Sequence, residues 1–488
     1  MKKHFFTFGL IFILGGLIVF GQRPSVAPKP VAREVSKILG ASSLLSSQNT
    51  DVPIVTKTLA NGLEVIVLRD QAVPLVTVEM AVRNGSFTEP PELNGLSHLF
   101  EHMFFKTNDS IRRVREGKPL GSDLYLRNIG QLGITYNGRT QEEVVQYYFT
   151  TTSQYMGTAM AVVSNAVRYP TFDENEFSRE KEVVIGEIDR NESNPFFYLD
   201  RALKNKLFFK YPTRKNPLGT RETVATATTE KMRLIQARYY VPNNSALVVT
   251  GDVEPEAVFK KAEELFGDWQ RTEDPFKRFP LVEHPPLAAS VGEVIQQPVE
   301  NAFLSLGWQG PSIGKDDAAT YAADVFSYIL QQPNSRFQRA LVDSGLTGGA
   351  NIGYYTQRNV GPIQLTVVTT PDKARAALKA IYAEIDAFNK PNYFTNEELE
   401  SAKTLLAASD LYDREKPSEY THTLSFWWST ASVDYYRNYQ KNLRAVTRAD
   451  VSRYLSTYIQ GKPHVGLALI SPDAQAATKL TPDELIGK

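Results

Sequence analysis

Apolar and polar residues alternate along this 488-residue chain with two different periods. A period of two, in runs rich in β-branched and aromatic residues, predicts strands over residues 63–68, 76–82, 134–138, 144–151, 246–250, 302–308, 362–368 and 464–470. A period near 3.6 predicts helices over residues 154–169, 177–188, 233–240, 255–266, 318–330, 372–388, 396–413 and 436–458. Asn61-Gly62, which separates two β-rich runs, is typical of a hairpin. The chain therefore mixes helices and strands throughout.

The order of strands and helices in the first half of the chain returns in the second half. The strand at 246–250, followed by Gly251-Asp252, has a counterpart at 464–470, followed by Ser471-Pro-Asp. An order that recurs after about two hundred residues indicates a duplication. The sequence therefore predicts the α+β class, with two homologous domains that each contain a mostly antiparallel sheet covered by helices.

The N-terminus and a Pro-rich segment in the middle of the chain give the predicted domain limits. Residues 1–21 have a basic start and an apolar run from Phe5 to Phe20, as in a secretory signal peptide. The alternative is an uncleaved membrane anchor, since the run is only marginally too short to span. Both alternatives predict export, which in a bacterium means the periplasm. Residues 22–50 form an N-terminal arm, 51–272 the first domain, 273–290 a linker and 291–488 the second domain.

Composition narrows the chemistry that the chain can carry. The 54 basic and 54 acidic residues balance, so nothing favours nucleic acid as a partner. Cysteine is absent, so any metal must be bound by histidine and carboxylate side chains. We interpret the aromatic run Phe426-Trp427-Trp428 as core or interface packing rather than as a binding platform.

One apolar segment combines a helical pattern with groups that bind metals. On a helix, His98, Glu101 and His102 project from one face, and most of the remaining positions are apolar. Asn94 is predicted to cap the N-terminus of this helix, and Lys106 lies near the C-terminal end, where a cation is favourable.

Three ionisable groups on one face of an apolar helix point to a bound metal. A lone buried histidine is usually a satisfied core residue, but burying three such groups together costs several kcal/mol unless something pairs them. Two neutral imidazoles four residues apart can bind one tetrahedral zinc ion, and an adjacent carboxylate can take a proton from water. The order His-x-x-Glu-His is that of the inverzincins.

A catalytic zinc site needs a third protein ligand besides His98 and His102. The other histidines lie in the predicted signal peptide, in the linker or in the second half. A carboxylate on a helix of the first half is the more economical choice, and the helix predicted to open with a capping box at 173–176 contains Glu180 and Glu187. Spacing alone does not select between the available carboxylates.

The segment 95–106 resembles the zinc motif of the pitrilysin and mitochondrial-processing-peptidase family of metallopeptidases, family M16. Other matches cover nearly the whole mature chain, at residues 61–65, 83–91, 136–140 and 180–187. The resemblance makes Glu187 the third ligand, and it gives Glu180 a role in orienting the ligands. Tyr136, Asn137 and Gly138, with glycine where the family usually has alanine, correspond to an edge strand that pairs with the substrate backbone.

The resemblance implies a zinc-dependent endopeptidase with one zinc ion per chain. The ligands would be His98, His102 and Glu187, and Glu101 would take a proton from water and pass it to the leaving amine. Two-domain members of the family form half of a clamshell and act as dimers. The implied substrates are therefore peptides or short unfolded polypeptides enclosed in a chamber.

The chain departs from the family in its second half. The family completes its site with an arginine and a tyrosine, and the aligned positions here are Leu341 and Gly348; Arg339, Tyr354 or Tyr355 would substitute in another register. The departure implies a heterodimer with a second M16-type subunit that supplies the arginine and tyrosine, and a homodimer is the less favoured form. The alternative function is a non-catalytic, peptide-holding subunit of such a complex.

Overall fold

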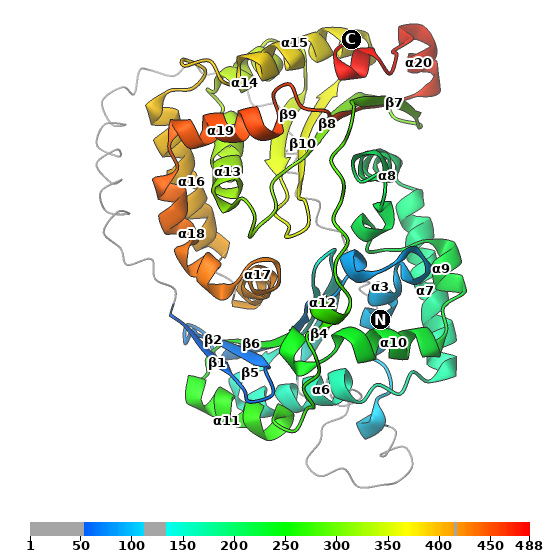
Figure 1. Cartoon of the computed structure of the whole chain (residues 1–488), viewed down its shortest axis with the longest axis vertical. Coiled ribbons are helices and arrows are strands. Elements are labelled where there is room, and N and C mark those ends of the chain that lie inside the picture. Colours follow the sequence, from blue (N-terminus) through cyan, green and yellow to red (C-terminus); the bar gives the residue numbers. More distant parts are fainter. Residues whose placement is uncertain (1–52, 112–132, 414–416) are drawn as a thin grey trace, which may run out of the picture. The chain divides into compact units, whose positions relative to one another are not determined.

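The computed structural model describes residues 53–111, 133–413 and 417–488, and these residues contain two β-sheets (Figure 1). The predicted signal peptide and the whole predicted N-terminal arm lie outside the described residues. In the first sheet the strand order is β1-β2-β6-β3-β5-β4, with β1 Ile54–Thr58, β2 Glu64–Arg69, β3 Leu75–Val82, β4 Thr135–Thr140, β5 Val145–Thr152 and β6 Ser245–Gly251. All neighbouring strands are antiparallel except β2 and β6.

The second sheet repeats the topology of the first. Its order is β7-β11-β8-β10-β9, with β7 Val291–Gln296, β8 Ala302–Gln309, β9 Gly349–Tyr354, β10 Pro362–Thr369 and β11 Val465–Ile470. When β1 is set aside, the other five strands of the first sheet have the same spatial order as the five strands of the second sheet. In both sheets the strand that comes last in the sequence pairs in parallel with the one that comes first, β6 with β2 and β11 with β7. The predicted α+β class and the duplication are thus confirmed, whereas the exact domain limits stay predictions.

Sixteen α-helices of the described residues surround the two sheets (Figure 1). Those in the first half are α3 Leu96–Phe104, α6 Met156–Arg168, α7 Glu174–Glu192, α8 Pro195–Leu207, α9 Arg221–Ala225, α10 Thr229–Tyr239, α11 Pro255–Phe266 and α12 Pro275–Arg278. Those in the second half are α13 Asp317–Gln331, α14 Arg336–Gln338, α15 Ala374–Ala387, α16 Asn396–Asp413, α17 Pro417–Thr430, α18 Val433–Ala445, α19 Arg448–Tyr458 and α20 Pro472–Thr478. In this described part of the chain, no helix has both the length and the apolar character needed to cross a membrane.

The predicted helix over 436–458 is wrong as a single element. The structure has α18 and α19 there, because Thr447 starts a new helix: its hydroxyl accepts from the Asp450 amide, and the Asp450 side chain accepts from the Thr447 amide. This reciprocal pair is a capping box inside an otherwise continuous pattern. Strands β7 and β9 and helix α8 were not predicted.

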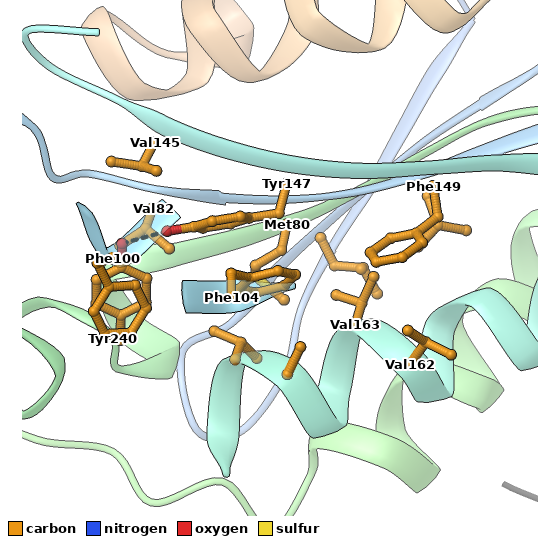
Figure 2. Close-up of a cluster of buried hydrophobic side chains, with 14 of the residues drawn as sticks. Met80, Val82, Phe100, Phe104, Val145, Tyr147, Phe149, Val162, Val163 and Tyr240 are labelled. Carbon is orange, nitrogen blue, oxygen red and sulfur yellow. Dashed lines mark hydrogen bonds between the residues drawn. The ribbon is translucent and has the colours of Figure 1, made fainter. Parts of the chain in front are cut away.

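The apolar side of α3 packs against one face of the first sheet (Figure 2). Phe104 stacks on Tyr147 of β5 with ring centres 3.8 Å apart, and Phe100 stacks on Tyr240 at 3.9 Å. The hydroxyl groups of Tyr147 and Tyr240 are hydrogen-bonded to each other at 2.6 Å, which satisfies two polar groups inside the core. These contacts fix the rotation of α3 about its axis, so its opposite side is turned away from the core.

The two halves of the chain exchange helices to cover the remaining sheet faces. Helix α17 of the second half packs on the first sheet, where Tyr420, Leu424 and Trp428 join a buried cluster with residues of β2, β3 and β6. Helix α8 of the first half packs on the second sheet, where Leu203 and Leu207 contact β11. The interpretation of the aromatic run as packing is confirmed for two of its residues: Trp428 is buried, and the partly buried Trp427 packs against the same cluster, whereas Phe426 is only partly buried.

The exchanged helix α17 forms a buried ion pair with the first sheet. His422 Nδ1 contacts the carboxylate of Glu79, which is fully buried in β3. Burial lowers the pKa of His422, but the charge of Glu79 and this hydrogen bond outweigh burial and raise the pKa above its usual value of 6.5.

We therefore expect pH-dependent destabilisation from His422→Gln. Because the folded pKa of His422 is raised, the stabilisation by the pair is fully present below about pH 6.5 and is lost as the pH rises through the folded value. The free energy of unfolding should fall by about 3 kcal/mol at pH 6, with a smaller difference at pH 9. Urea denaturation of both proteins at the two pH values measures this, and a pH-independent difference would contradict it.

Candidate metal centre

Helix α3 carries His98, Glu101 and His102 on the side turned away from the sheet. The three side chains are only 12–15% exposed. The helix begins after Gly95, whose φ of 88° is in the left-handed region that favours glycine. A Cβ at Gly95 would also lie 2.6 Å from the Cα of Gly219, so the start of α3 is tightly packed.

The predicted N-cap of α3 is wrong. The side chain of Asn94 does not cap the helix; its amide donates to the carbonyls of Thr213 and Asn216 at 2.9 Å. The buried Glu89 takes the capping role instead, and its carboxylate accepts from the Gly95 amide at 2.8 Å and from the Ser97 amide at 2.6 Å. An acidic group at a helix N-terminus also interacts favourably with the helix dipole.

Helix α7 brings Glu180 and Glu187 to α3. Its N-terminus is capped by Asp173 as predicted, but Glu176 does not complete a capping box, because its carboxylate binds the amide and hydroxyl of Thr107. This contact ties the start of α7 to the segment after α3. Glu180 and Glu187 lie two turns apart and so share one side of α7.

His98, His102 and Glu187 form one cluster. Within the described residues, it is the one group of three or more histidines and acids that lie close enough together to hold a metal ion. Oε2 of Glu187 lies 3.6 Å from Nε2 of His98 and 3.7 Å from Nε2 of His102. Ligands about 2.0–2.2 Å from a tetrahedral zinc ion lie about 3.3–3.6 Å from each other. The two distances to Glu187 are close to those of a tetrahedral zinc site, and all three ligand atoms lie within 4.8 Å of one another. Three protein ligands of this kind would leave the fourth position of a zinc ion open.

Glu180 holds His102 in place. Nδ1 of His102 lies 3.1 Å from Oε2 of Glu180, which leaves Nε2 directed at the cluster. Glu180 is in turn paired with Lys106 at 2.6 Å. A carboxylate on the far nitrogen of a ligand histidine fixes its tautomer and raises its basicity. The role that the resemblance implied for Glu180 therefore has a geometric basis.

The cluster is built to hold positive charge. Burial, with the nearby charge of His102, lowers the pKa of His98 to about 4. Burial also disfavours a charge on His102, but hydrogen bonds to Glu180 and Glu187 outweigh it and raise the pKa to about 9. For both glutamates burial acts to raise the pKa, yet contacts with His102 lower it. A proton on His102 thus provides the charge that a cation provides in the loaded site.

Glu101 lies between the cluster and strand β4. Its Oε2 is 4.0 Å from Nε2 of His98 and accepts a hydrogen bond from the hydroxyl of Thr140 at 2.9 Å. Burial raises the pKa of Glu101 to about 7, which is suitable for a group that takes up and releases a proton near neutral pH. Thr140 lies in the segment 136–140 that resembles the family, but no role was predicted for it.

Strand β4 is one of the two edge strands that the first sheet has among the described residues, and its Gly138 lies directly over Glu101. A Cβ at Gly138 would lie 2.5 Å from Oε1 of Glu101, so the glycine makes room for the carboxylate. Tyr136 is 46% exposed and stacks on Phe105 of the segment after α3. Asn137 is half-buried, and its side chain accepts from the Gly138 amide. Of the three residues predicted to bind substrate, Gly138 therefore lies against Glu101, and Tyr136 and Asn137 precede it on the same strand.

The second half brings no arginine and tyrosine to the aligned positions. Leu341 is fully buried in the core of the second half, and Gly348 immediately precedes β9. Two of the three candidates from another register have other partners: Arg339 donates to the Asn334 carbonyl, and the Tyr354 hydroxyl donates to the Pro311 carbonyl at 3.0 Å. The third, Tyr355, is 37% exposed.

The fold and the cluster together define a zinc-metallopeptidase-like protein, and sequence comparisons agree. Residues 64–221 match the family model described as insulinase (peptidase family M16), and residues 226–406 match the model described as the peptidase M16 inactive domain. Together these models span more than half of the chain, which belongs to the M16 family.

The chain is similar to bacterial proteins named zinc proteases. It is 25% identical over 356 residues to the uncharacterized zinc protease YmxG of Bacillus subtilis, covering 72% of this chain and 82% of that protein. It is 22% identical over 440 residues to the zinc protease PqqE of Helicobacter pylori, covering 87% and 96%. The crystal structure of a protease from Helicobacter pylori matches the fold with a TM-score of 0.75 at 20% identity, covering 85% of this chain and 99% of that one.

Glu180→Gln should weaken zinc binding by about 10- to 100-fold, because the neutral amide no longer raises the basicity of His102. Competition with a chromogenic chelator measures the affinity. The control is Glu182→Gln, an exposed glutamate on the same helix, which should bind zinc like the wild type. Equal affinities of the two variants would show that Glu180 does not support the ligand.

Gly138→Ala should displace the Glu101 carboxylate and leave the zinc ligands in place. We expect unchanged zinc affinity and a decrease of roughly 10- to 100-fold in kcat for peptide hydrolysis. Gly353→Ala is the matched control, since a Cβ at that edge-strand glycine meets no atom within 4 Å among the described residues. Full activity of Gly138→Ala would mean that Glu101 tolerates the displacement.

Proposed function

We propose that this chain is a zinc-dependent endopeptidase that hydrolyses peptides or short unfolded polypeptides. The observation that carries the proposal is the convergence of His98, His102 and Glu187 at zinc-ligand distances beside Glu101. Membership of the M16 family and the names of the bacterial relatives support it.

In this proposal each residue has a separate task. His98, His102 and Glu187 would hold one zinc ion per chain, which supplies a Lewis acid for the scissile carbonyl and the attacking water. Glu101 takes the proton of the water and delivers it to the leaving amine. Thr140 orients the Glu101 carboxylate through its hydrogen bond.

The substrate would bind along β4. An edge strand has backbone groups that no neighbouring strand uses, so an extended peptide can add to the sheet there. Such pairing reads the extended shape of the peptide more than its side chains, and it places a peptide backbone beside Glu101. Tyr136, Asn137 and Gly138 are the residues that would contact it.

We further propose that the active form is a dimer that encloses the substrate, with a second M16-type subunit as the partner. Leu341, which is buried, and Gly348, which is exposed, cannot replace an arginine and a tyrosine, so the partner would supply both. A homodimer is the less favoured form. The basic and apolar N-terminal sequence favours an exported, periplasmic protein, either processed or anchored.

The alternative function is a non-catalytic subunit that holds peptides. The description of the second matched model as an inactive domain is in its favour. Against it, a subunit without catalysis has no need of Glu101, whose burial among ionisable groups is unfavourable.

Glu101→Gln tests the function. We expect hydrolysis of a quenched peptide library by the zinc-loaded chain to fall by about 100-fold or more, with unchanged zinc content, because glutamine cannot carry the proton. Glu182→Gln is the control and should retain activity. If the wild type is silent while zinc-replete, addition of a zinc-less M16 subunit that bears the arginine and tyrosine should restore hydrolysis. Silence of that mixture would favour the peptide-holding role.

A further inference from the structure

The loop between β9 and β10, residues 356–361, is a buried polar segment in the second half. Gln357 is 2% exposed and Asn359 is 8% exposed. Val360 has a φ of 57°, in the left-handed region that β-branched residues rarely adopt, so surrounding contacts must hold the loop in this form. Buried backbone groups need hydrogen-bond partners, and this loop obtains several of them from the first half of the chain.

Glu143, in the turn between β4 and β5, provides one set of partners. One carboxylate oxygen accepts from the Arg358 amide and the other from the Asn359 amide, both at 2.8 Å. The side chain is 5% exposed, so these are two buried, charge-assisted hydrogen bonds. The turn that carries Glu143 connects directly to Thr140, whose hydroxyl donates to Glu101. The loop is therefore attached to the strand that borders the site.

Lys215, at the end of the 3-10 helix Pro212–Lys215, provides the second set. Its ammonium group is 2% exposed and donates to the side-chain oxygen of Gln357 and to the carbonyls of Asn359, at 2.7 Å, and Val360, at 2.8 Å. Asn94, just before α3, binds the carbonyls on both sides of Lys215, those of Thr213 and Asn216. The same loop is therefore also attached to the start of α3.

The loop is thus linked to the two elements whose separation defines the site, to β4 through the turn that carries Glu143 and to α3 through Lys215 and Asn94. Strand β4 carries the substrate edge and Thr140, whereas α3 carries the two histidines and Glu101. The Glu143 and Lys215 charges compensate each other in the buried loop: burial raises the pKa of Glu143, and the positive charge of Lys215 opposes that rise. Removing one group leaves the other buried without its counter-charge.

We propose that Glu143 and Lys215 are positioning residues, which use the 356–361 loop of the second half to hold β4 at a fixed distance from α3. The second half then takes part in catalysis, because it aligns the substrate edge with Glu101 without contacting the substrate. This inference rests on the proposed peptidase function.

Glu143→Gln in the full zinc-loaded chain tests the proposal, because the amide keeps one acceptor and loses the other along with the charge. We expect full zinc content, at least 10-fold faster hydrogen exchange in residues 135–152, and a kcat per zinc-loaded molecule that falls by roughly 10- to 100-fold. The matched control is Glu293→Gln, which removes another ion pair between the halves, Lys206 to Glu293 at 2.9 Å, far in sequence from the loop. It should change neither exchange in 135–152 nor kcat.

Two outcomes would overturn the proposal: unchanged exchange in residues 135–152, or faster exchange there with wild-type kcat. If Glu143→Gln does not fold, Gln357→Ala, which removes a single acceptor of Lys215, should give the same changes to a smaller extent, and wild-type behaviour of this variant overturns the proposal. Exchange is measured without substrate. A wild type that hydrolyses no peptide, with or without a partner subunit, would therefore reject the peptidase function while the exchange comparison still tests the attachment of β4.

Discussion

The geometry of the site depends on one constraint: the histidines of the short helix α3 are held against the glutamates of α7, on the side of α3 that faces away from the sheet. α3 has nine residues, and its other side is fixed in the core by two aromatic stacks, so it cannot rotate to expose its histidines. Glu180 and Glu187 then surround His102, and a positive charge between them becomes favourable. The two carboxylates raise the pKa of His102, and the same arrangement is favourable for a divalent cation.

Much of the fold could be predicted from the sequence, because the segments with the clearest apolar periodicity form the central strands of the two sheets. Strands β2, β3, β6, β8, β10 and β11 lie inside the sheets and are β-rich, so their patterns are clear, and the duplication followed from their order. Strands β7 and β9 lie at sheet edges, are only partly buried and contain glycine, which weakens the strand signal. The exchange of α8 and α17 was not predictable, because an apolar helix face does not identify the sheet that it covers.

The residues of the metal cluster were also largely predictable from the sequence, but the residues that hold α3 and Glu101 in position were not. The spacing of His98, Glu101 and His102 sufficed to bring them to one face, and the structure brings Glu187 to the histidines as the resemblance implied. Asn94 was assigned as the cap from residue type alone, whereas Glu89 does this from outside the helix. Thr140 and Glu89 lie in segments that resemble the family, but their roles depend on tertiary contacts, which the residue types alone do not indicate. A sequence motif such as His-x-x-Glu-His therefore identifies the metal ligands and the base more reliably than it identifies the residues that hold them in position.

The exchange of helices has a consequence for how the chain is made. Synthesis proceeds from the N-terminus, so the first sheet is complete once β6 has emerged, while α17, which covers one of its faces, follows well over a hundred residues later. Until then that face, with Ile66, Ala81 and Val248, has no cover from its final partner. An uncovered apolar sheet face favours aggregation. The nascent first half is thus a natural client for a holding chaperone, and expression of the first half alone should yield an aggregation-prone fragment rather than an isolated domain.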